Sequence, residues 1–144
     1  MYRISAYPKI FIGDNVVWVD YFSSPNYPEN YANNSTVVKV FDNPNKDFGA
    51  FIQLQVVYLN LEPNKDFLRI QDFASQRLLA SLTGYYGHAR NDALTYYTSG
   101  SLVLKFHSDE SVTRSGFLVR IQWVTTGSSS NCFYFFRAIY KEKY

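Results

Sequence analysis

The feature of this sequence that most constrains its fold is a series of short runs in which apolar and polar residues alternate. The clearest runs are SLVLKFH at residues 101–107 and FLVRIQW at residues 117–123. Such alternation places the apolar side chains on one face of an extended strand. No helix-length stretch repeats its apolar residues with the 3.6-residue period of a helix. The sequence predicts strands at residues 16–22, 36–41, 51–59, 67–70, 77–82, 102–107, 117–124 and 133–140.

Residues that favour turns separate these runs. Pro, Asn, Asp, Gly and Ser cluster at residues 24–28, 42–45, 63–65 and 125–130. Many short strands joined by regular turns are typical of antiparallel sandwiches and jelly rolls. We therefore expect an all-β fold, an antiparallel β-sandwich or jelly roll of about eight to ten strands.

Length and composition predict one folded domain. A chain of 144 residues with 47% apolar and 18% charged residues is long and apolar enough to bury a core. Aromatic residues make up 19%, which favours strands and supplies tyrosine for a contact surface. We expect a single domain over residues 1–144, with 125–144 forming an extra C-terminal strand or the start of a following segment.

Charge and cysteine content exclude several classes of protein. The net charge is +2, and the one Lys/Arg cluster, Lys141-Glu142-Lys143, is neutralised by its own glutamate. We therefore expect the protein to bind neither nucleic acid nor an anionic membrane surface. No apolar stretch is long enough to span a membrane. Cys132 is the single cysteine, so no internal disulfide can form. This normally favours a reducing compartment, and we expect Cys132 to be a buried apolar residue rather than an intermolecular partner.

Residue types that often act in catalysis are present, but the sequence does not arrange them as a catalytic group. His107, Ser108 and Asp109 are consecutive, so neighbours point to opposite faces of a strand and cannot form a relay. No Gly-x-Ser-x-Gly turn is present. His88 is the other histidine, and two histidines with one cysteine are too few for a structural zinc site. We predict that the protein is not an enzyme.

Five short motifs occur in an order that resembles the CUB domain family. They cover residues 22–124 and read FSSPNYPENY at 22–31, VYLNLE at 57–62, DFLRI at 66–70, LTGYYG at 82–87, and FHSDES at 106–111 followed by Gly-Phe at 116–117. The resemblance implies a β-sandwich that binds another molecule outside the cell.

The sequence departs from the family in its disulfides, which are usually two. Val37 and Tyr86 stand at two of the cysteine positions, the third falls in a shortened loop at residues 63–65, and the fourth is absent. We interpret this as a core rebuilt with apolar residues. Because a sandwich of this length can fold without disulfides, the extracellular expectation stands.

The resemblance also implies a calcium site. Glu62, Asp66 and Asp109 match three acidic positions that hold Ca²⁺ in many CUB domains, and oxygen atoms from several loops suit this hard cation. The carbonyl of Ser111 is a further expected ligand, and Tyr31 matches a tyrosine that braces the carboxylates. Val112 replaces an asparagine that often adds a ligand. The alternative is that these acids are ordinary solvated turn residues.

The leading functional hypothesis is a protein–protein interaction module, with a lysine side chain of the partner set against the acidic loops. One alternative is a carbohydrate-binding module, for which Trp18, Tyr96 and Tyr97 are the candidate platform. Another is a structural or assembly domain of a larger particle. Overlapping N-glycosylation sequons at Asn33 and Asn34 are candidate modification sites if a eukaryote secretes the protein.

Overall fold

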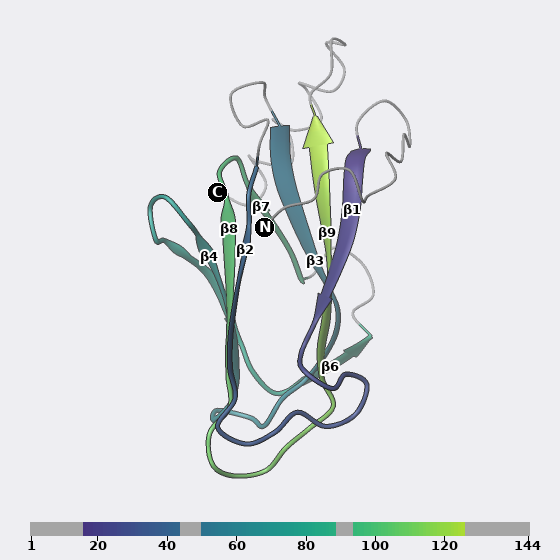
Figure 1. Ribbon diagram of the computed structural model, residues 1–144, viewed down its shortest axis with the longest axis vertical. Coiled ribbons are helices and arrows are strands. Elements are labelled where there is room, and N and C mark those ends of the chain that lie inside the picture. Colours follow the sequence, from purple (N-terminus) through teal and green to yellow (C-terminus); the bar gives the residue numbers. More distant parts are fainter. Residues whose placement is uncertain (1–15, 44–49, 89–93, 126–144) are drawn as a thin grey trace.

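The described part of the chain forms two antiparallel sheets packed face to face. A computed structural model describes residues 16–43, 50–88 and 94–125 (Figure 1). Within these ranges no α-helix occurs, and hence none long and apolar enough to cross a membrane. The strands are β1 (Val16–Ser23), β2 (Thr36–Phe41), β3 (Ala50–Asn60), β4 (Phe67–Asp72), β5 (Leu78–Leu82), β6 (Tyr85–His88), β7 (Thr95–Thr98), β8 (Leu102–His107) and β9 (Gly116–Thr125).

The long strand β3 organises the first sheet. The order of this five-stranded sheet is β1-β9-β3-β6, and β7 also pairs with β3. Strand β7 pairs with residues 52–55 of β3 and β6 with residues 58–60, so the two short strands share one edge of β3. The second sheet has four strands in the order β2-β8-β4-β5.

The core lies between the sheets and follows the alternation seen in the sequence. In β3, every second residue from Ala50 to Val56 is buried, and β8 buries Leu102, Leu104 and Phe106. Strand β9 adds Phe117, Val119, Ile121 and Trp123. The prediction of an all-β antiparallel sandwich is confirmed.

Two strands were not predicted. The sequence analysis predicts no strand at Tyr85–His88, which forms β6, or at Thr95–Thr98, which forms β7. Each has four residues, which is too short for an alternation signal to stand out. The strand expected at 133–140, with Cys132, lies outside the described residues.

The positions of the missing cysteines are filled in different ways. Val37 is half-buried and packs against the core, as expected. Tyr86 is 50% exposed, so the interpretation of an apolar core replacement is wrong at that position. It lies on the edge strand β6, where a side chain can remain in solvent.

Candidate metal centre

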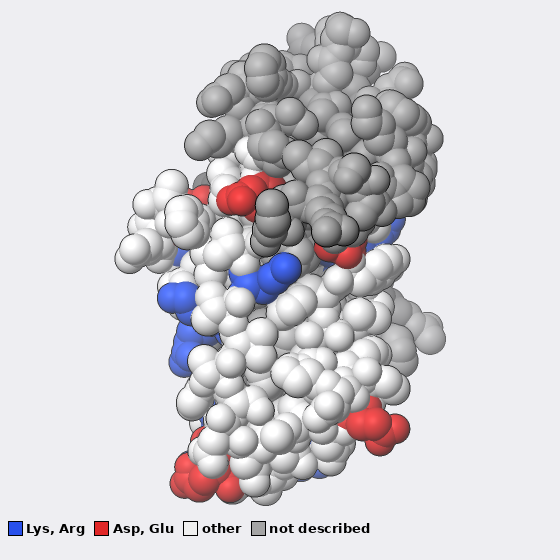
Figure 2. All heavy atoms as spheres, in the orientation of Figure 1, with Lys and Arg blue, Asp and Glu red and all other residues white. Residues whose placement is uncertain are grey.

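The candidate site lies in loops at one end of the sandwich, the lower end in Figure 1. There β1 leads into the loop before β2, β3 into the loop before β4, and β8 into the loop before β9. On the face shown in Figure 2, two groups of red acidic side chains lie at this end, and others lie in the upper half of the view. The predicted acidic residues come from the second and third of these loops.

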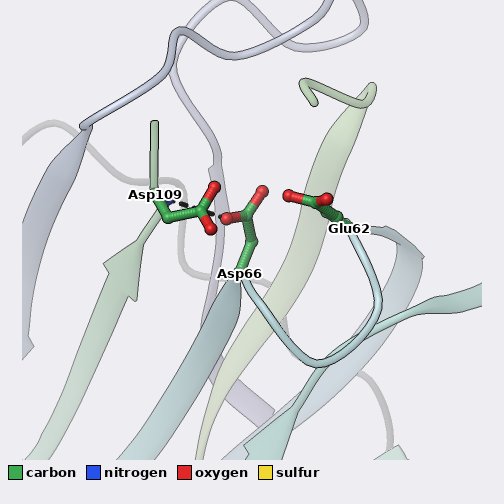
Figure 3. Close-up of side chains that lie close together, drawn as sticks. All are labelled: Glu62, Asp66 and Asp109. Atoms are coloured by element: carbon green, nitrogen blue, oxygen red, sulfur yellow. Dashed lines mark hydrogen bonds between the residues drawn. The ribbon is translucent and has the colours of Figure 1, made fainter. Parts of the chain in front are cut away.

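A single tight turn presents both Glu62 and Asp66. The carbonyl oxygen of Glu62 accepts hydrogen bonds from the amides of Lys65 at 3.4 Å and Asp66 at 3.2 Å. Asn64 takes the left-handed backbone that this turn needs, with a φ of 61°, and asparagine tolerates that conformation. The shortened loop therefore brings the two acids to the same side (Figure 3).

Thr83, in the connection between β5 and β6, braces this turn. Its hydroxyl donates to the carbonyl oxygen of Glu62 at 3.1 Å and accepts from the amide of Asn64 at 2.9 Å. No sequence pattern indicates this role, because Thr83 and Asn64 are 19 residues apart and no motif links them.

Asp109 is positioned by the loop that follows β1. The amide of Asn34 donates to the carbonyl oxygen of Asp109 at 2.7 Å. Buried Ser108 donates its hydroxyl to the carbonyl of Ala32 at 2.8 Å and accepts from the amide of Ser35 at 2.9 Å. These contacts hold the start of the β8–β9 loop against the β1–β2 loop.

The three carboxylates meet at this end of the molecule. One oxygen from each of Glu62, Asp66 and Asp109 lies within 4.8 Å of the others (Figure 3). Asp66 is completely buried, whereas Glu62 and Asp109 are half-buried. Asp66 Oδ1 accepts from the backbone amide of Asp109 at 2.9 Å, which couples the two loops.

Tyr31 lies directly behind the acidic cluster. Its buried hydroxyl donates to Asp66 Oδ2 at 2.5 Å and accepts from the amide of Glu62 at 3.1 Å. Burial raises the pKa of Tyr31, and its hydrogen bond to the carboxylate of Asp66 raises it further. The ring packs edge-on against Phe106 at a centroid distance of 5.1 Å, so the core fixes the hydroxyl.

Ser111 links the two acids at the rim. Its hydroxyl is 3.0 Å from Asp109 Oδ1 and 3.2 Å from Glu62 Oε2, and its amide donates to Asp109 Oδ1 at 2.9 Å. The hydrogen bond from the backbone amide of Ser111 is the main reason that the pKa of Asp109 is lowered, and the positive charge of nearby Lys65 adds to the effect. Ser111 thus meets the cluster through its hydroxyl and amide, whereas the sequence analysis expected its carbonyl.

This donor set fits a hard divalent cation. A fully buried carboxylate is costly unless a cation or several hydrogen-bond donors balance its charge. Asp66 accepts two hydrogen bonds, from the hydroxyl of Tyr31 and the amide of Asp109, but the carboxylates of Glu62 and Asp109 add further negative charge beside it. All the side-chain donors are oxygen atoms, which is the preference of Ca²⁺.

The candidate carbohydrate platform is not assembled as expected. Tyr96 packs against the core, and burial raises its pKa. Tyr97 lies on the outer side of the sheet, where its hydroxyl accepts from Gln53 Nε2 at 2.9 Å. The backbone of Trp18 pairs with Trp123 in the first sheet, and its side chain lies outside the described part of the structure. Among residues 16–43, 50–88 and 94–125, the most exposed aromatic side chains are instead Tyr21, Phe73 and Tyr85.

The two sequon residues lie in the loop that holds Asp109. Asn33 and Asn34 are both exposed. Asn34 has a φ of 53° and donates its amide to Asp109, as described above. Their side chains are accessible, and the prediction that either carries a glycan stays a prediction.

Comparison with known proteins defines the class. The family model for the CUB domain matches residues 17–121, which is most of the chain, and the chain belongs to the CUB domain family. CUB domains in general are non-enzymatic modules that mediate protein–protein interactions.

Solved structures share this fold. The full extracellular region of zebrafish Gpr126/Adgrg6 matches with a TM-score of 0.63 and 22% identity over 74% of this chain and 14% of that one. The human MASP-1/3 CUB1-EGF-CUB2 region matches with a TM-score of 0.63 and 23% identity, over 74% and 42% of the two chains. The MASP-1 CUB2 domain bound to Ca²⁺ matches with a TM-score of 0.59 and 18% identity, over 72% and 90%. The chain therefore spans less than half of the first two structures.

Proposed function

We propose that this CUB domain is an extracellular protein-binding module whose binding end is organised by Ca²⁺. The observation that carries the proposal is the meeting of Glu62, Asp66 and Asp109 around buried Asp66. The solved MASP-1 CUB2 domain, which has the same fold, is described as bound to Ca²⁺. The three carboxylates would hold the ion, with Ser111 at the rim and Tyr31 behind.

When bound, the ion would neutralise repulsion among the carboxylates and fix the two loops that carry them. The chain supplies the rest of the preorganisation. Tyr31 holds Asp66 from the core side, Thr83 holds the turn of Glu62, and Ser111 holds Asp109. Ordering the site before a partner arrives lowers the entropic cost of binding.

A lysine side chain is the partner group that fits this end. Glu62 and Asp109 are half-exposed, so their outer oxygens face solvent while Asp66 is buried. An ammonium group can donate three hydrogen bonds, and such bonds to carboxylates are stronger than those between neutral groups. A lysine of the partner would therefore pair with Glu62 and Asp109 above the ion.

The extracellular assignment rests on two supports. The matching part of zebrafish Gpr126/Adgrg6 belongs to an extracellular region. Both sequon asparagines, Asn33 and Asn34, are exposed. We also propose that residues 1–144 act as one domain without catalytic activity.

The test uses a lysine mimic, because no partner is identified. Backbone amide NMR spectra would be recorded during titration with N-acetyl-lysine-methylamide, in millimolar calcium and in chelator. We expect shifts at residues 62, 66 and 109–111 only when calcium is present. The norleucine analogue, which lacks the ammonium group, is the matched ligand control.

Two variants sharpen this test. Glu62→Gln should abolish the calcium-dependent shifts, because it removes a charge that faces both ion and ammonium. Glu110→Gln removes the same charge from an exposed neighbour outside the cluster, and should leave the shifts intact. Equal binding of the lysine and norleucine compounds, or of lysine with and without calcium, would refute the proposed function.

A further inference from the structure

Three tyrosine rings form a row beside the acidic loops, and we propose that this tyrosine row binds an apolar side chain of the same partner that places its lysine there. The row consists of Tyr27 in the connection between β1 and β2, Tyr58 of β3 and Tyr85 of β6. The inference rests on the proposed function. It adds a second contact, which would select among proteins that offer a lysine.

The three rings contact one another in series. The centroid of the Tyr58 ring lies 5.7 Å from that of Tyr27, at an interplanar angle of 54°. The same centroid lies 6.5 Å from that of Tyr85, at an angle of 80°. Both distances are within the range of stabilising aromatic pairs. Three segments that are far apart in the sequence therefore present one continuous aromatic surface.

Polar contacts hold the middle of the tyrosine row in place. The hydroxyl oxygens of Tyr58 and Ser115 lie 2.6 Å apart, within hydrogen-bonding distance, and Asn60 Nδ2 donates to Ser115 Oγ at 2.9 Å. Asn60 is in turn paired with Tyr85 between β3 and β6. The row is thus fixed by the sheet before any ligand arrives, and ordering it adds little to the entropic cost of binding.

Tyr85 is the member of the row that a partner can cover. Its side chain is 70% exposed, the largest fraction among the large hydrophobic side chains that the structure describes. The ring is held against Tyr58 and lies across Gly87, where an added Cβ would be 3.1 Å from the hydroxyl of Tyr85. A fixed, exposed tyrosine offers a large contact area at low entropic cost, and tyrosine is enriched among the residues that dominate protein interfaces.

Direct contacts join the tyrosine row to the acidic loops. The amide of Leu61 donates to the carbonyl oxygen of Gly84 at 2.9 Å, and Thr83 bonds to the turn that carries Glu62, as described above. Tyr85 therefore follows directly after the segment that braces Glu62. Strand β6 lies at the same lower end of the sandwich as these loops (Figure 1). One partner can reach both surfaces without spanning the domain.

The strand pairing sets the spacing that the partner must match. Tyr85 is paired with Asn60, which precedes Glu62 by two residues. With about 5 Å between neighbouring strands and about 3.3 Å per residue along a strand, the backbones of Tyr85 and Glu62 are roughly 8 Å apart. An extended segment covers this distance in about two or three residues, and the lysine side chain adds reach. The apolar residue of the partner should therefore lie about two to four positions from its lysine.

The chemistry of the row favours an apolar side chain of a protein. The three tyrosines and the neighbouring Asn60 and Ser115 carry no formal charge. The centre of a protein interface is depleted in charged residues and enriched in tyrosine. An anionic ligand would be repelled by the carboxylates of Glu62 and Asp109 nearby, whereas an apolar residue next to a lysine suits both surfaces.

The test is an NMR titration of the protein, in millimolar calcium, with paired peptides. Each peptide is capped at both ends and contains lysine, one to three glycines and then phenylalanine, and its matched control has glycine in place of phenylalanine. Both sequence orders are used. We expect at least one phenylalanine peptide to bind about threefold to tenfold more tightly than its control and to shift the amides of residues 58 and 85. The glycine controls should shift only residues 62, 66 and 109–111.

Two variants connect this gain to the tyrosine row. Tyr85→Ser should remove the gain from phenylalanine, and its calcium-dependent shifts with the glycine controls report that it stays folded. Phe73→Ser removes another exposed ring, 55% exposed, from the turn after β4, and should keep the gain.

The outcomes separate this inference from the proposed function. If the lysine peptides bind in calcium but phenylalanine adds nothing, or if Tyr85→Ser keeps the gain, the inference is wrong and the proposed function stands. If no lysine peptide binds, both are wrong. A phenylalanine gain that is lost in Tyr85→Ser and kept in Phe73→Ser is the result that we expect.

Discussion

Tyr31 illustrates how one buried side chain connects the core to the candidate site. Its ring packs on Phe106, while its hydroxyl serves both Asp66 and the amide of Glu62. The resemblance to CUB domains predicted this neighbourhood from the position of Tyr31 alone. The donor and acceptor roles of the hydroxyl could not be predicted, because they depend on partners 31 and 35 residues away.

Tyr31 predicts a loss of stability at high pH. Its pKa is raised in the folded protein, so the native state keeps a proton that the unfolded chain releases at about pH 10. The associated stability is complete below that pH and declines as the pH rises above it. Urea unfolding of the calcium-free protein at neutral and alkaline pH measures this decline.

The comparison variant is Tyr31→Phe. It should lower the stability at neutral pH by about 1–3 kcal/mol, because Asp66 loses a donor and the amide of Glu62 an acceptor. It should also lose less stability on going to alkaline pH than wild type does. Tyr96→Phe controls for the other tyrosine whose pKa is raised by burial. An equal alkaline loss in Tyr31→Phe and wild type would show that Tyr31 is not responsible.

Val112 is in an unfavourable backbone conformation beside the candidate site. Its φ is 36°, which is uncommon for any residue other than glycine and strained for a β-branched one. Both Val112→Gly and Val112→Asn should therefore stabilise the calcium-free protein, by about 1 kcal/mol. Only Val112→Asn supplies an oxygen, so only this variant should bind calcium more tightly in calorimetric titration. Equal calcium affinities for the two variants would rule out a ligand role for this position.

At the scale of elements, the sequence predicted the long strands well and the short ones poorly. The alternation in β3, β8 and β9 is strong because one face of each packs against the core. Strands β6 and β7 are four residues long, and their pairing with β3 depends on tertiary contacts rather than on their own pattern.

The start of β9 depends on the absence of a side chain at Gly116. Its φ is 87°, and a Cβ there would lie 1.8 Å from the hydroxyl of buried Ser24. That hydroxyl accepts a hydrogen bond from the amide of Phe117 at 3.0 Å, so it cannot move away without losing this bond. Gly84 has a similar φ of 80°, with open space around it.

We therefore expect the two glycines to respond differently to alanine. Gly84→Ala should cost about 1 kcal/mol from backbone strain alone. Gly116→Ala should cost about 3 kcal/mol or more, since overpacking adds to the same strain. Chemical denaturation of both variants measures the difference. Equal losses would show that Ser24 does not restrict this position.

The outer face of the four-stranded sheet contains a repulsive pair. Lys105 of β8 lies directly opposite Arg69 of β4, and the guanidinium of Arg69 sits 4.9 Å from the ring centroid of Phe67. Like charges in this arrangement destabilise a sheet. Lys105→Glu should therefore stabilise the protein by about 0.2–1 kcal/mol at low salt, with a smaller gain at high salt. The stability of Lys105→Gln, which removes the repulsion without adding an attraction, should lie between those of wild type and Lys105→Glu. A Lys105→Glu protein less stable than wild type would contradict this explanation.

At the scale of the whole molecule, the sandwich places three distinct surfaces on one small domain. One end carries the acidic loops, the outer face of the five-stranded sheet carries Gln53, Gln55 and Gln122, and that of the four-stranded sheet carries Arg69 and Lys105. The acidic residues could be predicted because each belongs to a recognisable motif. The grouping of the glutamines could not be predicted, since Gln53, Gln55 and Gln122 belong to no motif and come together only through strand pairing.

The central claim is that the loop end is a calcium site, and thermal melting tests it most directly. An ion that binds only the native state at a hundredfold excess over its dissociation constant should add about 2.7 kcal/mol. For a domain of this size, the melting temperature should then rise by about 5–10 °C in calcium relative to chelator. Magnesium should have little effect, because it needs a tighter octahedral site.

Asp109→Ala should abolish the rise while leaving the melting temperature in chelator nearly unchanged. Glu110→Ala, which removes the same charge from an exposed neighbour, should retain the rise. Calcium-dependent stabilisation in wild type and Glu110→Ala, but not in Asp109→Ala, is the result that this account predicts. Identical melting temperatures of the wild-type protein in calcium and in chelator would contradict it.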